Sequence, residues 1–469
     1  MIRMLLAAPA SGSGKTAVTC ALLAALQKRG LTPCAFKCGP DYIDPMFHRA
    51  VLGVESHNLD LFLSDEGTLR GLFARSSLGH GAAVCEGAMG FYDGVGGVTD
   101  RASAWHVART LDLPVILVVR AKGTSLTLAA QIKGLREFRK HSGIVGVILN
   151  DCSPMLCRSL APTLEREAGL PVLGCLPHLE QAEIKSRHLG LYTAREIRDL
   201  TARIELLAKA LEENVDMDAL LELCQGEAEG DSAECFPDIP QKQPPVWLAV
   251  ARDEAFCFTY AESLEALAAA GADLIYFSPL RDKTLPAGTC GLYLPGGYPE
   301  LYAEQLSANE AMRRAIREAV SRGMPTVAEC GGFLYLGQAL GDEKGIRWPM
   351  AGVLPGEGFP AGKLVRFGYG TLRGKEDSLL LRAGEEIPAH EFHYWDSTEN
   401  GGGLQVEKPV SGRSWICGFM TDTLYAAFPH LYFAGRPQLA ERFVKAAENY
   451  RKREEDGYGA ERIAGADRP

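Results

Sequence analysis

The sequence predicts an α/β protein with two domains, each built around a parallel β-sheet. Three observations lead to this prediction. Short apolar stretches alternate with amphipathic ones along the chain, which is the pattern of βαβ units. A polar stretch at 226–245, rich in acids, proline and glycine, interrupts the alternation. The 469 residues also exceed the usual length of one domain.

The strands follow from the apolar stretches, taken in order. In the first half, IRMLLAAP, AAVCEGAMG, PVILVVRA and IVGVILN predict buried parallel strands. After the polar stretch, VWLAVARD, ADLIYFSP, GLYLPGG and PTVAEC predict the strands of a second sheet. We therefore assign 1–225 to a first domain, 226–245 to a linker, 246–450 to a second domain and 451–469 to a charged, disordered tail.

Composition excludes several classes of protein. The formal net charge of -10 disfavours a nucleic-acid binder with a broad basic surface. The longest apolar stretches have the length of strands rather than of membrane spans. The 13 cysteines include no CxxC pair, which fits a reducing compartment better than a disulfide framework or a zinc site. We predict a cytoplasmic protein without a membrane or nucleic-acid partner.

The stretch APASGSGKT follows the first predicted strand and opens a helix, the context that a phosphate-binding loop requires. Backbone N–H groups of Gly12, Ser13 and Gly14 would surround an anion at the helix N-terminus. Lys15 would reach the β- and γ-phosphates of ATP, and the Thr16 hydroxyl would bind Mg²⁺. Proline replaces the first glycine of the usual pattern, but the remainder predicts a nucleotide site.

Acids follow two other predicted strands. The stretches FKCGPDYIDP and VCEGAMGFYDG contribute Lys37, Asp41, Tyr42, Asp44, Glu86 and Asp93. Ligands of open parallel sheets bind beyond the carboxyl ends of the strands, and Mg²⁺ prefers carboxylate oxygens. We expect Asp41 and Glu86 to join Thr16 in binding Mg²⁺, and the other residues to position the substrate. The alternative is that these acids are solvated or cap helices.

Cys330 lies in PTVAECGGFLYLG, between a predicted strand and a predicted helix. Taken alone, a cysteine there fits a buried structural role, because free cysteine packs as a small apolar residue. The surrounding blocks favour another role. Together, APASGSGKT, KCGPDYIDP, EGAMGFYDG, VWLAVARDEAFCFTY, LPGGYPELYA, AECGGFLYLG and HEFHY closely resemble the cobyrinic acid a,c-diamide synthase family, in the cobyrinate and cobyrate amidotransferase group.

This resemblance implies a dethiobiotin-synthetase-like P-loop domain followed by a class I, flavodoxin-like glutamine amidotransferase domain. Cys330 would attack the side-chain amide of glutamine, and His430 in AAFPHLYF would be its base. The oxyanion donors would be the backbone N–H groups of Gly297 and Gly331. The resemblance supplies no third acid of a triad. His390 and His393 in AHEFHYWD are not spaced for metal binding, and we interpret them as structural.

The resemblance also implies a reaction. ATP would activate the a and c acetate carboxylates of cobyrinate as acyl phosphates, and ammonia from glutamine would convert them to amides, in cobalamin biosynthesis. Mg²⁺ would accompany ATP as a substrate complex. The sequence does not fix the oligomeric state, for which a homodimer is the working expectation.

Three alternatives stay open. The same chemistry could act on hydrogenobyrinate or nickel-sirohydrochlorin, whose enzymes look similar across these blocks. Cobyrate synthesis on the other side chains is disfavoured by the KCGPDYIDP and EGAMGFYDG loops. A P-loop switch that binds a macromolecule is a different class of function. Ala10, in place of the second lysine of DNA-partitioning ATPases, argues against it, as does the amidotransferase half.

Overall fold

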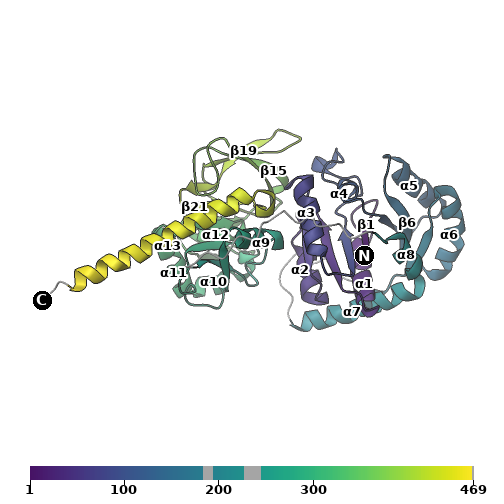
Figure 1. Cartoon of the computed structure of the whole chain (residues 1–469), viewed down its shortest axis with the longest axis horizontal. Coiled ribbons are helices and arrows are strands. Elements are labelled where there is room, and N and C mark those ends of the chain that lie inside the picture. The colour runs from purple at the N-terminus through teal and green to yellow at the C-terminus, as the bar shows by residue number, and fades with distance from the viewer. Residues whose placement is uncertain (183–193, 227–244, 467–469) are drawn as a thin grey trace. The chain divides into compact units, whose positions relative to one another are not determined.

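The computed structural model describes residues 1–182, 194–226 and 245–466, and its chain forms two compact units (Figure 1). Within the described residues, the first unit lies in 1–226 and the second begins at 245. The predicted linker at 226–245 falls almost entirely outside the described residues, so its boundaries stay a prediction. Each unit is described separately below.

The described part of the first unit contains a seven-stranded sheet in which neighbouring strands are parallel, with the order β3-β2-β4-β1-β5-β6-β7. Its strands are β1 (Ile2–Ala7), β2 (Pro33–Cys38), β3 (Ser56–Leu59), β4 (Ala82–Glu86), β5 (Val115–Arg120), β6 (Ile144–Asn150) and β7 (Val172–Leu176). The first strand lies in the middle of the sheet. The loop that follows it therefore opens at the centre of the carboxyl edge, where parallel α/β sheets bind ligands.

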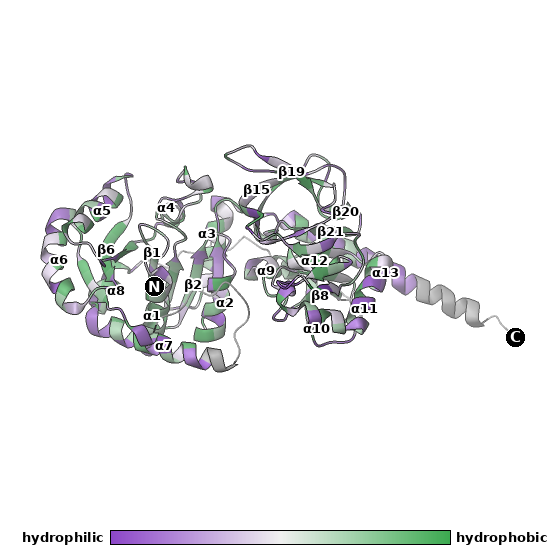
Figure 2. Ribbon diagram, turned by 180° about the vertical axis from the view of Figure 1, so that it is seen from behind, coloured by the Kyte–Doolittle hydropathy of each residue, from purple (hydrophilic) through white to green (hydrophobic). Residues whose placement is uncertain are grey.

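Helices cover both faces of this sheet. Those described are α1 (Lys15–Lys28), α2 (Ile43–Phe47), α3 (Glu66–Ser77), α4 (Ala104–Thr110), α5 (Leu126–Glu137), α6 (Pro154–Ala168), α7 (Ala194–Asn214) and α8 (Met217–Leu223). Apolar side chains of α1, α7 and α8 pack on one face, and those of α3 to α6 on the other. Figure 2 shows mostly green strands, with green and purple alternating along α6 and α7, as expected of a buried sheet under amphipathic helices.

The second unit is built around a six-stranded sheet within the described residues, with the order β20-β21-β11-β10-β8-β9. Its strands are β8 (Val246–Ala251), β9 (Ala272–Phe277), β10 (Gly291–Leu294), β11 (Thr326–Glu329), β20 (Phe419–Thr421) and β21 (Leu424–Ala427). All neighbours are parallel except β20 and β21, which are antiparallel. Thus the α/β class and the two sheet-centred units are confirmed, and β8 to β11 lie where the sequence predicts them.

Helices cover this sheet too. They are α9 (Ala261–Ala269), α10 (Ala303–Ala308), α11 (Glu310–Ser321), α12 (Gly331–Leu336) and α13 (Pro437–Ala466). Side chains of α9 and α13 pack in the core on one face, and those of α10 to α12 in the core on the other. The sequence analysis predicted a disordered tail from 451, whereas α13 extends to Ala466. Pairs of opposite charge one turn apart, such as Lys452 with Glu448, support its exposed part.

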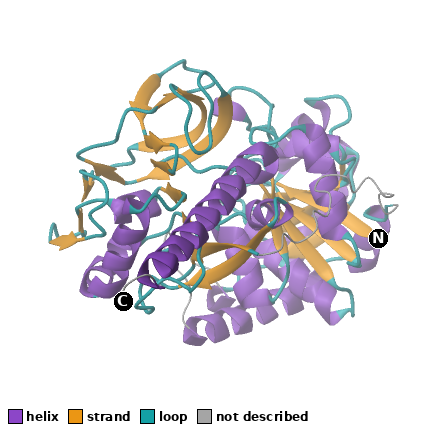
Figure 3. Ribbon diagram, turned by 60° about the vertical axis from the view of Figure 1, so that its left-hand side comes forward, coloured by secondary structure: helices purple, strands orange, loops and turns teal. Residues whose placement is uncertain are grey.

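Between α12 and β20 the chain forms strands that the sequence analysis did not predict, visible in Figure 3 as a strand- and loop-rich part. They are β12 (Ala339–Gly341), β13 (Arg347–Pro349), β14 (Glu357–Pro360), β15 (Arg366–Gly374), β16 (Glu386–His393), β17 (Trp395–Ser397), β18 (Leu404–Glu407) and β19 (Ser414–Cys417). In the described residues they form two four-stranded sheets, β13-β12-β14-β17 and β16-β15-β18-β19. The second of these carries the HEFHY block.

Two further observations concern classes considered from the sequence. Every cysteine that the structure describes is free and buried. Within the same residues, no helix has the length and apolar character needed to cross a membrane.

Candidate active sites

The phosphate-binding loop in the first unit is held by its glycines and by β6. Gly12 and Gly14 have φ values of 77° and 94°, which side chains other than glycine rarely adopt, and α1 begins directly afterwards at Lys15. The Asn150 side chain donates to the Ser13 carbonyl at 3.0 Å. A Cβ atom on Gly14 would lie 2.0 Å from that amide nitrogen, so only glycine fits. These contacts and backbone angles fix the shape of the loop.

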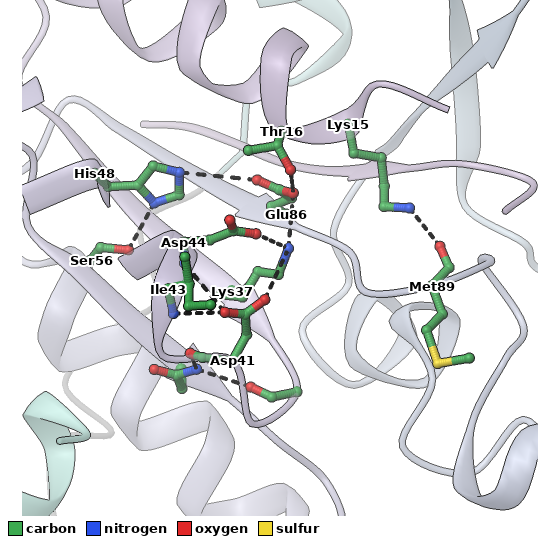
Figure 4. A network of polar contacts seen from close by, with 12 residues as sticks. Lys15, Thr16, Lys37, Asp41, Ile43, Asp44, His48, Ser56, Glu86 and Met89 are labelled. Carbon is green, nitrogen blue, oxygen red and sulfur yellow. Dashed lines mark hydrogen bonds and ion pairs between the residues drawn. The ribbon is translucent and has the colours of Figure 1, made fainter. Parts of the chain in front are cut away.

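The Lys15 side chain lies in this loop and is 7% exposed. Its ammonium donates to the carbonyl of Met89 at 2.5 Å and to that of Ala10 at 3.4 Å. Burial, and after it the neighbouring charge of Lys37, lower the pKa of Lys15 to about 8. Figure 4 shows Lys15 directed toward Met89 and away from the acids described next.

A cluster of charged groups gathers around Lys37, the penultimate residue of β2. Its ammonium donates to Glu86 Oε1 at 2.9 Å and to Asp44, and the Thr16 hydroxyl donates to the same Glu86 oxygen at 2.7 Å (Figure 4). Glu86 is 1% exposed. Burial opposes the charged form of Lys37, but the carboxylates of Glu86, Asp44 and Asp41 outweigh it and raise the pKa of Lys37 well above its ordinary value. The lysine is thus a fixed cation.

The structure brings some predicted residues into this cluster and gives others local contacts. Asp41 Oδ1 accepts from the backbone N–H groups of Ile43 and Asp44, so this carboxylate caps the start of α2, and its other oxygen is 3.9 Å from Lys37 Nζ. Tyr42 immediately precedes α2. Asp93 accepts from the Gly90 N–H at 2.9 Å within its own loop. The roles predicted for these three residues in binding metal or substrate stay predictions.

The donors around Thr16 fit Mg²⁺. The Thr16 hydroxyl and Glu86 Oε1 are 2.7 Å apart, close to the roughly 2.9 Å that separates adjacent oxygens in an octahedral Mg²⁺ shell. Glu86 Oε2 is buried and has no hydrogen-bond donor among the described residues. No group of three or more His, Cys, Asp or Glu side chains in the described chain is arranged to hold a metal.

Sequence reasoning missed one residue of this site. His48 follows α2, is fully buried, and its Nδ1 lies 3.0 Å from the Ser56 hydroxyl. Its Nε2 is 4.0 Å from Glu86 Oε2, and burial lowers the pKa of His48 to about 4. The neutral ring thus packs beside Glu86 without competing with Lys37. The only signal in the sequence was its position one helical turn after Asp44.

In the second unit, Cys330 lies at a sharp turn between β11 and α12. Its φ of 48° and ψ of -102° are strained for a residue with a side chain. This is the geometry of a nucleophile elbow. Burial is the main factor that raises the pKa of the Cys330 thiol, with Glu300 adding to it. Burial outweighs the favourable effect of the helix N-terminus on the thiolate, so the thiol needs a base.

The loop after β10 lies against this turn. An added Cβ on Gly331 would lie 3.0 Å from the backbone nitrogen of Gly297, and one on Gly332 would lie 2.1 Å from the Leu294 carbonyl. The two predicted oxyanion donors are therefore neighbours. Two glycines after the cysteine let the helix approach β10 closely.

His430 follows β21, and Cys330 follows β11. Because these two strands are parallel neighbours, the two residues lie at the same edge of the sheet. The Cys330 N–H donates to the Ala427 carbonyl at 2.8 Å. An added Cβ on Gly296 would lie 2.4 Å from the ring of His430, which places this ring beside the loop that also borders Gly331. The geometry agrees with a Cys330–His430 pair.

The HEFHY block packs behind His430. His390 and His430 exchange two backbone hydrogen bonds, of 3.3 and 2.8 Å, and the ring of His393 stacks on Phe428 with 3.8 Å between centroids. Burial lowers the pKa of His390 to about 3 and that of His393 to about 4. Both are neutral packing groups near neutral pH, in agreement with the structural interpretation. Glu391 between them is also buried, and sequence reasoning did not consider it.

Comparisons with known proteins agree with this arrangement. Residues 4–191 match the CobQ/CobB/MinD/ParA nucleotide binding domain, and residues 248–437 match the CobB/CobQ-like glutamine amidotransferase domain. A cobyrinate a,c-diamide synthase from Salmonella typhimurium is 40% identical over 451 residues, covering 94% of this chain and 97% of that protein. The synthase of Caldanaerobacter subterraneus subsp. tengcongensis is 38% identical over 94% of this chain and 97% of its own. That of Gloeobacter violaceus is 40% identical over 94% and 96%.

Proposed function

This chain belongs to the cobyrinate a,c-diamide synthase family, and we propose that it amidates the a and c acetate side chains of cobyrinate with ATP and glutamine, in cobalamin biosynthesis. One observation carries the proposal. A single chain holds a glycine-rich phosphate loop beside a lysine–carboxylate cluster, and also an elbow thiol at the same sheet edge as a histidine. Activation of a carboxylate needs the first set of groups, and release of ammonia from glutamine needs the second.

At the first site a substrate carboxylate oxygen attacks the γ-phosphorus of ATP, ADP leaves, and an acyl phosphate forms. Ammonia then attacks the carbonyl carbon, phosphate leaves and a proton is lost, which yields the amide. Lys15 must leave the Met89 carbonyl to reach the γ-phosphoryl group. Thr16 and Glu86 would hold Mg²⁺, with Asp41 close by, and the ion when bound neutralises charge on the phosphates. Lys37 and Asp44 would orient the carboxylate, together with Tyr42 and Asp93.

At the second site Cys330 attacks the carboxamide carbon of glutamine, and ammonia leaves as a thioester forms. Water hydrolyses the thioester to glutamate. Backbone N–H groups of Gly297 and Gly331 would stabilise the oxyanion. His430 would take the thiol proton and pass it to the departing nitrogen. We also propose that the enzyme is a homodimer and that it binds no nucleic acid.

The test is an activity panel with cobyrinate, hydrogenobyrinate and nickel-sirohydrochlorin, each with ATP, Mg²⁺ and glutamine, read by mass spectrometry. We expect two amidations of cobyrinate, with two ATP consumed. Faster double amidation of one of the other tetrapyrroles would reassign the substrate. ATP turnover that responds to a macromolecule and not to any tetrapyrrole would contradict the proposed function.

A further inference from the structure

The residue directly before the proposed nucleophile is a buried acid. Glu329, the last residue of β11, is 1% exposed. The Leu431 N–H donates to its Oε1 at 3.0 Å, and the Tyr293 hydroxyl donates to its Oε2 at 3.1 Å. A buried carboxylate is costly unless it is hydrogen-bonded and paired with a positive group. These two donors fix the orientation of the carboxylate.

The ring of His430 lies against the same carboxylate. His430 Nδ1 is 3.6 Å from Glu329 Oε2, and His430 is 2% exposed. This distance is longer than a hydrogen bond, but catalytic hydrogen bonds are often long in ligand-free sites and shorten when substrate binds. Leu431 directly follows His430 in the chain. The hydrogen bond from the Leu431 N–H to Glu329 Oε1 therefore also links Glu329 to the backbone that carries the imidazole ring of His430.

The chain following His430 does not supply an acid. The residue two positions later is Tyr432, whose ring packs edge-on against that of Tyr260, with 5.1 Å between centroids. The acid beside the histidine comes instead from the neighbouring strand. In β11, Glu329 points to the face that holds Tyr293, whereas Cys330 turns away at the elbow.

We propose that Glu329 is the positioning residue of the glutaminase site, holding His430 with its ring proton on Nδ1 so that Nε2 receives the proton of the Cys330 thiol. This inference rests on the proposed function. As the sulfur–carbon bond forms, the thiol proton moves to Nε2 and then to the nitrogen of the breaking carbon–nitrogen bond, which departs as ammonia. Glu329 keeps its charge throughout and stabilises the imidazolium.

Four other titratable groups interact electrostatically with Cys330 or His430. They are His390, His393, Glu300 and Glu391. Burial lowers the pKa of the first two to about 3 and about 4, and raises that of the two acids to about 7. At pH 8 the two histidines are therefore neutral and the two acids largely ionised. A change in the pH dependence of Cys330 alkylation above pH 8 therefore does not come from these four groups.

The experiment compares the parent enzyme with Glu329→Gln, which keeps the shape and removes the charge. We expect glutamine-supported kcat to fall on the order of 10⁴-fold, with the KM for glutamine little changed, by analogy with loss of the acid's charge in a serine protease triad. Ammonia-supported synthesis serves as the folding control. Tyr293→Phe removes one donor to the same carboxylate and should cost less, and Glu329→Asp should recover part of the activity.

Two readouts test Glu329 without the synthetase reaction. Nitrogen-15 NMR of the His430 ring should show the proton on Nδ1 in the parent and a mixture of tautomers in Glu329→Gln. The rate of Cys330 alkylation by iodoacetamide should be measured at several pH values above 8. Its dependence on pH should differ between the parent enzyme and Glu329→Gln. Failure of the proposed function would appear in the parent enzyme as missing tetrapyrrole amidation, with these readouts still informative. A Glu329→Gln enzyme with an unchanged tautomer and glutamine-supported kcat within about threefold of the parent would overturn the inference.

Discussion

At the scale of the residue, the backbone of Cys330 favours the proposed role of a nucleophile over that of a packing cysteine. Most cysteines in the described chain are buried in the core, and exposure alone does not distinguish Cys330 from them. Its φ of 48° does, because strain of this kind persists where the surrounding structure enforces it. The strain places the side chain at the edge of the sheet, next to the loop after β10 and the segment after β21.

Cys330→Ala should therefore lose amide synthesis from glutamine and keep synthesis from ammonium salts at raised pH, where more neutral ammonia exists. The reason is that, in the proposed reaction, the thiol serves only to release ammonia. The ratio of glutamine- to ammonia-supported rates in the purified variant is the measurement. Cys290→Ala is the matched control, because Cys290 is 3% exposed and lies before β10, at the opposite edge of the sheet. An unchanged ratio in Cys330→Ala would show that Cys330 is a structural cysteine.

Glu86 should act on the synthetase reaction alone, because it contacts Thr16 and Lys37 in the first unit. Glu86→Gln should lower synthesis from glutamine and from ammonia equally, on the order of a hundredfold or more, since it removes charge from a preorganised electrostatic site. Asp44→Asn should behave similarly through its contact with Lys37. Glu66→Gln, at an exposed position of α3, is the control. A loss restricted to the glutamine-supported rate would contradict the assignment of Glu86 to the synthetase reaction.

The sequence predicted residues whose surroundings are set by their own motif and missed residues whose contacts come from other segments of the chain. Lys15, Thr16 and Cys330 were predictable because the strand–loop–helix context specifies their neighbours. His48 and Glu329 were not, because their contacts depend on pairing between β2 and β4 and between β11 and β21, which the sequence does not display. Asp41 was predicted from its position beyond a strand, and its caps on Ile43 and Asp44 were visible only in the structure.

At the scale of the element, the strands of the parallel sheets were predictable because they are buried on both faces and read as continuous apolar runs. The antiparallel strands β12 to β19 were not. Many of their residues are exposed, among them Phe367 and Phe392, which face each other across β15 and β16. Apolar residues on an exposed face blur the alternation that identifies a strand.

The strand β16 should make stability depend on pH. Burial holds the pKa of His390 and His393 below the ordinary value of histidine, so their contribution is complete above about pH 6.5 and is lost as pH falls toward 4. Burial raises the pKa of Glu391 to about 7, so Glu391 acts in the opposite direction over much of this range. Within β16, two histidines against one glutamate leave a net loss of one proton, about 1.4 kcal/mol per pH unit between about pH 6 and 5. Outside β16, Glu300 with a pKa of about 7 and His48 with a pKa of about 4 act in opposite directions and offset each other over this range.

Replacement of one histidine should cancel this net loss. The free energy of unfolding, measured with denaturant from pH 7.5 to 5, should have a smaller pH slope in His393→Gln than in the parent, by about one proton. His178→Gln, at an exposed position in the first unit, controls for loss of a histidine outside the buried strand. Parallel slopes in parent and His393→Gln would mean that His393 titrates alike in the folded and unfolded chains.

At the scale of the whole molecule, each unit has its own hydrophobic cores and its own candidate site. The first unit has cores on both faces of its sheet, as does the second. This division was predictable because alternation stops at 226–245 and resumes afterwards. The number of strands and their order in each sheet could not be predicted from the sequence. Strand order depends on the crossover connections, which local composition does not specify.

Separate cores predict that the two halves fold and work as separate proteins. Residues 1–225 and 246–469 should each show a cooperative unfolding transition when expressed alone. The first piece should make amide from ammonia and the second should hydrolyse glutamine, because each carries the groups that its step needs. Mixed together, the pieces should use glutamine less efficiently per amide formed than the intact chain does, since ammonia released by the second piece is diluted and protonated before use. The measurement is the ratio of glutamate released to amide formed, with a chain cut by protease at an engineered site inside 226–245 as the matched control. If the first piece folds but makes no amide from ammonia, then its site requires residues beyond 225, and the predicted boundary is wrong.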